Sequence, residues 1–380
     1  MPLGLPPTPV SRKGTIRESN FLPAYQDFGG ERVSSVKKQP NMNISLELRA
    51  GEWVEVRNEE EILSTLDENG CLENLPFMPE MLRYCGKRFL VYKRADKTCD
   101  TISEKFVSRR MYNTVHLSDL RCEGDAHGGC DATCLLFWKE TWLKRIEDGE
   151  VPDKKSMTSR SNAYRCAIEN LYKGTKGKTV DPNKNGEIYS CQATELRRAT
   201  YPLARLDIRQ YWWDFKSGNA RIEEIVPVLC IGMFNWIFNR RGLGRILYIL
   251  TGARRYPHVN TSQMLKVKTP FENSDLQPGE IIQVKQMKEI VMTLNDWRNR
   301  GLAFDRHGEM LKYCGKKMKV LKRVHKIIDE KTGEMLVFRN PSIILEGAIC
   351  CGHYSPDRLL CPRSIYPFWR EIWLKRVDSG

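Results

Sequence analysis

Alternating apolar and polar positions predict short strands at two distant places in the chain. Residues 53–56 (WVEV) and 281–284 (IIQV) both alternate with the period of two that is typical of a strand with one buried face. After a Gly-Lys turn, each stretch is followed by a second strand-like run, RFLVYKR in one case and KMKVLKR in the other. Several short strands with tight turns predict a small, strongly bent sheet or barrel at each place.

The similarity between these two places extends well beyond the first strand. The block GEWVEVRNEEEILSTL matches GEIIQVKQMKEIVMTL, and the later blocks EMLRYCGKRFLVYKRADKTCD and FWKETWLKRIE match EMLKYCGKKMKVLKRVHKIID and FWREIWLKRVD. The matched ranges are 51–66 with 279–294, 80–100 with 309–329, and 137–147 with 368–378. Three blocks in the same order with near-constant offset indicate a duplicated domain of roughly 100 residues.

Each copy is predicted to hold a few further elements. A short helix is expected at EEEILSTL, and the turn residues of DEKTG predict a hairpin between KVLKRVHKII and EMLVF, with SIILEGAIC as another strand. The final block of each copy has aromatic residues at helical spacing, which predicts a C-terminal helix packed on its own sheet, with Lys144-Arg145 or Lys375-Arg376 in its last turn. The aromatic positions are Phe137, Trp138 and Trp142, and Phe368, Trp369 and Trp373.

The segment between the copies is basic and has helical periodicity. Residues 154–268 contain 21 lysines and arginines against 8 acidic residues, and so carry nearly all of the formal net charge of +14. Three or so helices are expected there, with Pro202 and Pro227 breaking or beginning them. The fold class is therefore α+β, with two small β-rich, SH3-like modules bridged by a basic helical insert. The expected divisions are a flexible N-terminal arm (1–47), the first module (48–150), the insert (151–270) and the second module (271–380).

Composition narrows the class of protein. Thirteen cysteines are an odd number, and the N-terminal residues lack an apolar segment of the kind found in a secretory signal. We therefore expect reduced thiols and a cytoplasmic protein. The longest apolar run, residues 225–238, is short for a membrane span and is followed by Asn239, Arg240 and Arg241. The chain is thus not expected to be transmembrane, although peripheral attachment to a membrane remains open.

Cysteine and histidine cluster in the first copy, in the stretch RCEGDAHGGCDATC. Cys122, Cys130 and Cys134 supply thiolates for a tetrahedral zinc site, and Cys99 or His127 would complete the four ligands. If a helix begins near Cys130, then Cys130 and Cys134 lie on one face and both sulfurs reach one ion. The density of ligands predicts a structural metal. Iron or an iron–sulfur cluster is the less favoured alternative, because the histidine-containing sets favour zinc.

The second copy holds a related but altered set of ligands, so that one or two zinc ions are expected in all. Cys134 corresponds to Ile365 and Cys99 to Ile328, which means that the two ligand sets differ. The candidate ligands there are His325, Cys350, Cys351, His353 and Cys361. Four other cysteines fit ordinary packing, namely Cys71, Cys166, Cys191 and Cys230, and the role of Cys85 and Cys314 stays open.

Catalysis is the alternative interpretation of the first cluster. A cysteine at a helix N-terminus has a stabilised thiolate, so Cys130 would be the nucleophile and His127 its base. An open position on the metal that activates water is a second route to an enzyme. Against the nucleophile, the corresponding Cys361 is followed by a proline, and no third, orienting residue is evident.

The insert combines apolar faces with a group of arginines. This pattern suits an anionic partner: an acidic membrane surface, a phosphoryl ligand or a nucleic acid. We expect Trp212, Trp213, Phe234 and Trp236 to form the core of the insert, because apolar helical stripes are usually buried. The arginines that would contact the partner are Arg240, Arg241, Arg245, Arg254 and Arg255.

Several blocks of the chain carry a resemblance to known sequences. EMLKYCGKKMKVLKRV, IIDEKTGEM, NPSIILEG, CPRSIYPFWREIWLKRV and YSCQATELRRAT are similar to a widespread group of uncharacterised bacterial proteins. The likeness covers most of the chain beyond residue 48 and implies a bacterial, cytosolic protein, but no activity or site. Together these observations predict a metal-stabilised binding or scaffold protein. An enzyme and a nucleic-acid-binding protein are the alternatives.

Overall fold

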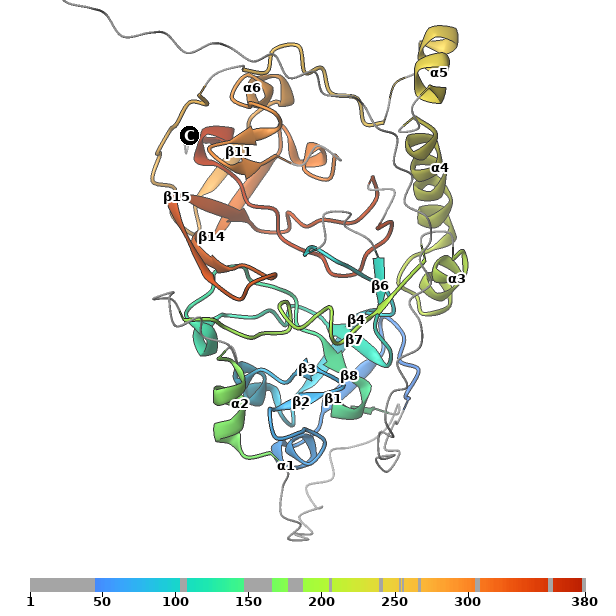
Figure 1. Cartoon of the computed structure of the whole chain (residues 1–380), viewed down its shortest axis with the longest axis vertical. Helices are drawn as coiled ribbons and strands as arrows, with labels where there is room; N and C mark the ends of the chain where they lie inside the picture. Colours follow the sequence, from blue (N-terminus) through green and yellow to red (C-terminus); the bar gives the residue numbers. More distant parts are fainter. Residues whose placement is uncertain are drawn as a thin grey trace, which may run out of the picture. The chain divides into compact units, whose positions relative to one another are not determined.

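The computed structural model describes residues 45–102, 108–146, 166–176, 187–204, 207–238, 242–252, 254, 256–265, 268–304, 308–354 and 358–377. These residues form a mixture of helices and antiparallel sheets, which makes the fold α+β (Figure 1). The α-helices are α1 (Glu59–Leu63), α2 (Ile168–Gly174), α3 (Arg209–Lys216), α4 (Ile222–Phe238), α5 (Leu243–Thr251) and α6 (Met287–Val291). Short 3-10 helices are η1 (Pro79–Tyr84), η2 (Asp125–His127), η3 (Glu140–Trp142), η4 (Leu311–Tyr313) and η5 (Glu371–Trp373). The strands are β1 (Trp53–Val56), β2 (Cys71–Leu72), β3 (Leu75–Pro76), β4 (Arg88–Arg94), β5 (Thr98–Cys99), β6 (Ser108–Arg110), β7 (Thr114–Leu117), β8 (Trp138–Lys139), β9 (Leu143–Arg145), β10 (Tyr201–Pro202), β11 (Ile281–Val284), β12 (Arg298–Asn299), β13 (Leu302–Ala303), β14 (Lys317–Ile328), β15 (Met335–Leu345) and β16 (Leu374–Arg376).

The two predicted modules each contain one main sheet with corresponding strands. In the first the strand order is β8-β7-β4-β1-β9, and in the second it is β15-β14-β11-β16. Val54 is opposite Phe89 in the first sheet, and the corresponding Ile282 is opposite Met318 in the second. β1 and β11 have the same burial pattern, with the second and fourth residues of each strand buried. The predicted alternation and the short helix α1 are therefore confirmed, as is the hairpin between β14 and β15.

The predicted C-terminal helix of each module is wrong. In the first module the block FWKETWLKR forms β8, η3 and β9, and β9 pairs antiparallel with β1. The second module ends in the same way, with η5 followed by β16, which pairs with β11. Trp138 and Trp142 are fully buried, as expected of core residues, but a strand, a tight turn and a strand bring them inward. The Lys-Arg pairs consequently lie on edge strands and do not cap a helix.

The insert is helical only in part. Residues 192–198, within the segment that was expected to be helical, form turns. Pro227 lies inside α4, where its missing N–H removes a single hydrogen bond to the carbonyl four residues earlier, and Pro202 lies in β10. The expected aromatic core of the insert is also wrong, since Trp212 is 61% exposed and the other three aromatic side chains are only partly buried. No single helix in the described part of the chain is long and apolar enough to cross a membrane.

The insert packs against both modules. Cys166, Leu171 and Leu196 belong to the hydrophobic core of the first module, while Ile225 and Val228 of α4 pack with Leu359 and Leu360 from the second module. A buried ion pair between Lys97 and Asp214, 2.5 Å apart, joins the first module to α3. The insert therefore has no separate core of its own among the described residues. Most of the predicted N-terminal arm, residues 1–44, lies outside them.

Candidate metal centre

The cysteine-rich stretch of the first module is an irregular loop with fixed ends. The Cys122 N–H donates to the carbonyl of Cys134 at 2.8 Å, which closes the loop. Gly124 has a φ of 85°, and a Cβ there would lie 2.1 Å from the carbonyl oxygen of Cys130. Only glycine fits this position, because any other residue would be strained at this positive φ and its side chain would clash with the facing loop. The close turn directs the following η2, and with it His127, back toward Cys122.

Three potential ligands meet at this loop. The Sγ atom of Cys122 lies 3.3 Å from Nε2 of His127 and 3.3 Å from Oε1 of Glu80, which comes from η1. The three ligand atoms all lie within 4.8 Å of one another. Among the residues that the structure describes, this is the one group of three such side chains close enough to share an ion. A thiol, an imidazole and a carboxyl group are all common zinc ligands.

The cluster is buried and its polar atoms are incompletely satisfied. The side chains of Glu80 and His127 are 6% and 2% exposed. Within the described structure, Oε2 of Glu80 and Nδ1 of His127 have no hydrogen-bond partner. Burial lowers the pKa of His127, which therefore stays a neutral imidazole, while burial and the nearby Glu80 raise the pKa of the Cys122 thiol well above its usual value. The site thus presents two electron-pair donors and a protonated thiol to a buried space.

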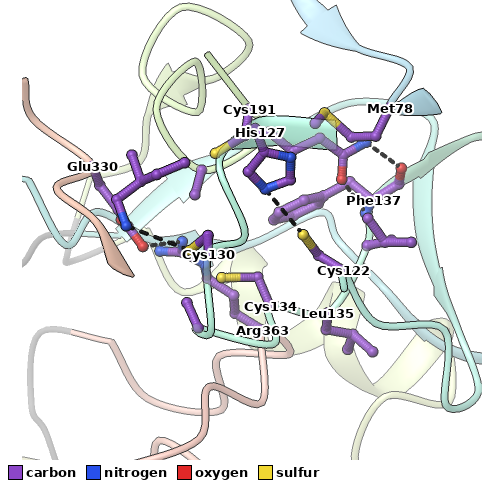
Figure 2. A pocket seen from close by; sticks show the side chains of 15 residues that line it. Met78, Cys122, His127, Cys130, Cys134, Leu135, Phe137, Cys191, Glu330 and Arg363 are labelled. Atoms are coloured by element: carbon purple, nitrogen blue, oxygen red, sulfur yellow. Dashed lines mark hydrogen bonds and ion pairs between the residues drawn. The ribbon is translucent and has the colours of Figure 1, made fainter. Parts of the chain in front are cut away.

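Two members of the cluster, Cys122 and His127, also line a small cavity of about 40 Å³, into which further thiols project (Figure 2). Cys122, Cys130, Cys134 and Cys191 all line it, together with His127. Burial raises the pKa of both Cys134 and Cys191 to about 12. Three of the four predicted cysteine ligands of the first copy therefore meet His127 at one cavity. Cys191, which the sequence assigned to ordinary packing, belongs to the same group.

Cys130 is not placed as the catalytic alternative requires. No helix begins near it, because residues 131–137 have an irregular backbone. Its Sγ atom accepts a hydrogen bond from the N–H of Ile328 at 3.4 Å, whereas His127 contacts Cys122. Burial raises the pKa of the Cys130 thiol above its usual value. The expectation of a thiolate stabilised by a helix dipole is therefore wrong, and so is the pairing of Cys130 with His127.

The loop is also where the two modules and the insert meet. Asp131 accepts hydrogen bonds from the N–H groups of His325 and Lys326 on β14, at 2.9 and 3.2 Å, and its carboxylate lies 2.9 Å from Nζ of Lys322. The insert contacts the loop through Tyr189, whose ring would lie 2.5 Å from a Cβ on Gly128. The cavity therefore lies at a junction of three parts of the chain that are distant in sequence.

Cys99 lies apart from Cys122, His127 and Glu80. It is fully buried and pairs with Cys361 of the second module, and a hydrogen bond from Cys361, together with the charge of Arg363, lowers the pKa of Cys99 to about 6. Arg363 donates to the carbonyl of Cys99 at 3.3 Å and pairs with Glu330 at 2.7 Å. Cys350 is half-buried near this pair. Cys99, Cys350 and Cys361 thus form a second thiol group, which joins the two modules.

Of the five predicted ligands of the second module, the structure brings only Cys350 and Cys361 into one group, and Cys351, His353 and His325 have other partners or surroundings. Lys312 donates to Sγ of Cys351 at 2.7 Å, whereas His127 contacts the corresponding Cys122 in the first module. His353 contacts Glu224 of α4 at 3.0 Å, and His325 is exposed on β14. The one group of three potential metal ligands among the described residues therefore lies in the first module.

Sequence reasoning missed Glu80, although a signal was present. Glu80 and Glu309 occupy the same position in the matched blocks EMLRYCGK and EMLKYCGK. In the second module both carboxylate oxygens of Glu309 accept backbone hydrogen bonds, from Cys351 at 3.1 Å and Tyr354 at 3.0 Å. In the first module Glu80 faces Cys122 and His127 instead. The repeated glutamate thus keeps its place beside the corresponding cysteine and differs in its partners.

The predicted arginine surface is described only in part. Arg245 and Arg254 are exposed, and Arg254 contacts His258 at 2.7 Å and lies over the ring of Tyr248. The remaining three arginines, Arg240, Arg241 and Arg255, lie outside the described residues.

Comparisons with known proteins yield no relative. No protein-family model matches the chain, no curated protein matches it, and no solved structure matches it. The resemblance seen in the sequence blocks therefore stays a prediction, and the interpretation of the site depends on its own geometry.

Proposed function

We propose that Glu80, Cys122 and His127 bind a zinc ion and that the protein is a metal-stabilised binding protein. The observation that carries this proposal is the pair of buried atoms without a hydrogen-bond partner, Oε2 of Glu80 and Nδ1 of His127, in a three-ligand cluster beside a cavity lined by thiols. Buried polar atoms without partners are uncommon, and each suggests a missing partner such as an ion or a water molecule.

Electrostatics favours a cation as that partner. A carboxylate that is 6% exposed is costly to bury without a compensating positive charge. A divalent ion would compensate Glu80 and displace the proton from the Cys122 thiol, since thiolates are the form that binds metals. A fourth ligand is available from the thiols that line the same cavity: Cys130, Cys134 and Cys191. Four ligands of these types suit a closed, structural zinc site.

The proposed role of the ion is to hold the junction of the modules in place. The ligand loop contacts β14 through Asp131 and the insert through Gly128, so fixing the loop would fix both neighbours. We further propose that the modules are two copies of one SH3-like unit, which is supported by the matching strand registers. Between them they would present the basic insert to an anionic partner in a reducing, cytoplasmic setting, as thirteen free thiols suggest.

Removing the metal tests this proposal. A chelator should lower the stability of the protein by about 4 kcal/mol if the ion is present at roughly a thousand times its dissociation constant. The C122S variant should have low stability with or without the chelator. Cys230 is exposed and lies outside the cavity, so C230S is the matched control and should respond to the chelator as the unaltered protein does. A chelator that leaves the unfolding midpoint of the unaltered protein unchanged would refute the site.

A second candidate function is an enzyme with an open metal position. Cys122 lines not only the small cavity but also a groove of about 970 Å³ between the modules. Three protein ligands and one bound water beside a groove is the arrangement of catalytic zinc sites. Substituting cobalt for zinc distinguishes the two, because its visible absorption reports coordination number and thiolate ligands. A spectrum with one thiolate ligand that changes with pH as the bound water loses a proton would favour the enzyme, and an invariant spectrum with two or more thiolates would favour the structural site.

A further inference from the structure

The helix pair α4 and α5 has an apolar surface that nothing in the described structure covers. The inner face of α4 is buried against the second module, and a Cβ on Gly232 would lie 2.6 Å from Cδ1 of Leu359. The outer face carries Ile222, Val226 and Met233, all more than half exposed. One face of α4 is therefore used in the fold, while the opposite face is mostly apolar and exposed in the described structure.

Helix α5 is more exposed still. It follows α4 after a bend of 105°, and Figure 1 draws it beyond the end of α4, away from both sheets. Gly244 is its one buried residue, whereas Ile249 and Leu250 are 69% and 75% exposed. An isolated helix of nine residues is marginally stable in water, and large contiguous apolar patches are rare on the surface of monomeric proteins. The exposed face of α5 therefore suits burial in a partner.

The charges around this surface indicate the kind of partner. Residues 222–271, which span both helices, contain seven lysines and arginines and only two acidic residues, Glu223 and Glu224 in the first turn of α4. Arg245 on α5 and Arg254 just after it are both exposed. A second copy of the chain would bring these like charges together across a two-fold contact, which is unfavourable. Isoleucine and leucine provide no stacking or hydrogen bonding for nucleic-acid bases, so the apolar face would gain nothing from DNA or RNA. Aliphatic side chains bordered by arginines match a bilayer with anionic headgroups.

We propose that the α4–α5 surface, defined by Ile222, Val226, Met233, Ile246, Ile249 and Leu250, docks on an anionic lipid membrane. The helices lie in the plane of the interface, with the aliphatic side chains among the acyl chains and Arg245 and Arg254 at the headgroups. Neither helix alone is long enough to span the bilayer. This inference deepens the proposed function, because it names the anionic partner of the insert.

Vesicle co-sedimentation of the full chain tests the proposal. The protein should pellet with vesicles of phosphatidylcholine mixed with phosphatidylglycerol, bind vesicles of phosphatidylcholine alone much more weakly, and lose affinity as salt is added. Replacing Ile249 and Leu250 together by aspartate should weaken binding at least roughly tenfold, because two buried aliphatic side chains are lost. The double variant R245Q/R254Q should weaken it by roughly 25-fold, since each arginine near an anionic surface contributes about a fivefold effect.

The matched control is a pair of exposed apolar residues elsewhere in the chain. Leu336 and Val337 on β15 are also exposed, and replacing both by aspartate should leave vesicle binding unchanged. Circular dichroism and the unfolding midpoint of each variant establish that it is folded. Unaltered binding by the folded I249D/L250D variant, or no binding of the unaltered protein to anionic vesicles, would overturn the proposal. So would a dimer that the same variant disperses, because a second copy would then occupy the surface.

Metal content measured on the same samples separates this proposal from the one on which it rests. A chain that contains zinc and ignores anionic vesicles would overturn the membrane proposal alone. A chain that contains no metal and binds vesicles would overturn the zinc site and support the membrane surface.

Discussion

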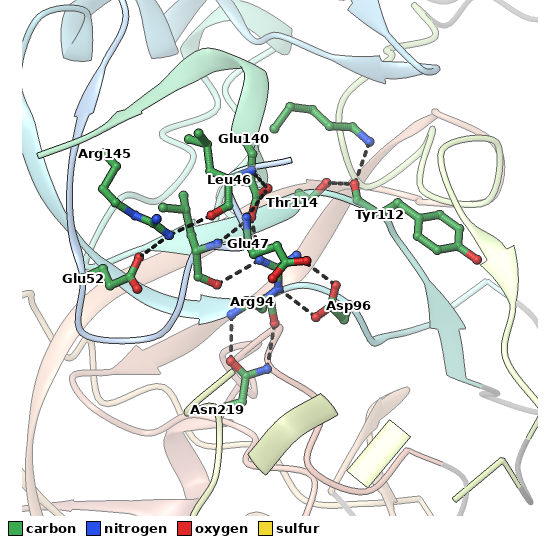
Figure 3. A network of polar contacts seen from close by, with 12 residues as sticks. Leu46, Glu47, Glu52, Arg94, Asp96, Tyr112, Thr114, Glu140, Arg145 and Asn219 are labelled. Carbon is green, nitrogen blue, oxygen red and sulfur yellow. Dashed lines mark hydrogen bonds and ion pairs between the residues drawn. The ribbon is translucent and has the colours of Figure 1, made fainter. Parts of the chain in front are cut away.

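Replacing Glu140 by alanine should destabilise the first module more than most other single changes. The carboxylate is fully buried and accepts hydrogen bonds from the N–H groups of Leu46 at 2.7 Å and Leu48 at 3.0 Å, and from Arg94 at 2.5 Å (Figure 3). Without it the buried N–H of Leu48 has no partner, which costs about 1–3 kcal/mol. Arg94 also loses one of its two acidic partners but keeps Asp96 at 2.8 Å. Breaking a buried ion pair costs about 3–5 kcal/mol, and because Arg94 keeps one acidic partner the expected loss is about 3 kcal/mol.

Urea unfolding followed by tryptophan fluorescence measures this loss, because Trp138 and Trp142 are buried in the same module. The matched control is Glu52→Ala, which breaks a largely exposed ion pair with Arg145 and should cost less than about 1 kcal/mol. A folded E140A variant that loses less than about 1 kcal/mol would refute the reasoning. The corresponding Glu371 accepts the N–H groups of Ser274 and Asp275, so the same experiment can be repeated in the second module.

Three further predictions concern pH, a buried ion pair and the ligand loop. Burial lowers the pKa of His116 to about 3, so below a pH of roughly 6.5 the unfolded chain binds a proton that the folded protein does not bind. The free energy of unfolding should therefore fall by about 1.4 kcal/mol per pH unit on acidification. The H116Q variant should reduce that slope in urea titrations at several pH values. Replacing Lys97 by alanine leaves Asp214 buried without its cation and should cost about 3–5 kcal/mol in the same assay, whereas a loss below about 1 kcal/mol would show that the pair contributes little. Gly124→Ala should abolish metal binding in elemental analysis, because the new methyl group would clash with the backbone of Cys130 in the facing loop. Gly51→Ala is the control, since Gly51 has a similar φ of 91° and a Cβ there would meet nothing within 4 Å, and this variant should keep the metal. Equal metal content in both variants would contradict the role of the clash.

The sequence predicted the elements whose periodicity is local. Alternation located β1 and β11, and the turn residues located the hairpin between β14 and β15. The aromatic spacing at Trp138 and Trp142 identified two core residues but the wrong element, since residues four apart can also point inward from a strand followed by a tight turn. Whether this block forms a helix or strands depends on the pairing of β9 with β1. These two strands are about 90 residues apart in sequence, so their pairing leaves no local pattern.

The candidate site was predicted where its ligands lie close in sequence. Cys122, His127, Cys130 and Cys134 fall within one loop and meet at one cavity. Glu80 and Cys191 come from η1 and from the insert, and no spacing rule connects them to the loop. The correspondence of Glu80 with Glu309 in the two copies was the available signal, and it marked a residue that both modules place beside a cysteine. The predicted helix at Cys130 is absent because hydrogen bonds between this loop and β14 hold the loop in an irregular conformation.

The most direct test of the central claim is elemental analysis of the purified protein, with the visible absorption spectrum recorded on the same sample. The account predicts about one zinc ion per chain in a colourless solution. That zinc should be lost from E80Q, C122S and H127N but kept in C230S. A folded protein without stoichiometric metal, or with metal that all three variants retain, would contradict the proposed centre of Glu80, Cys122 and His127.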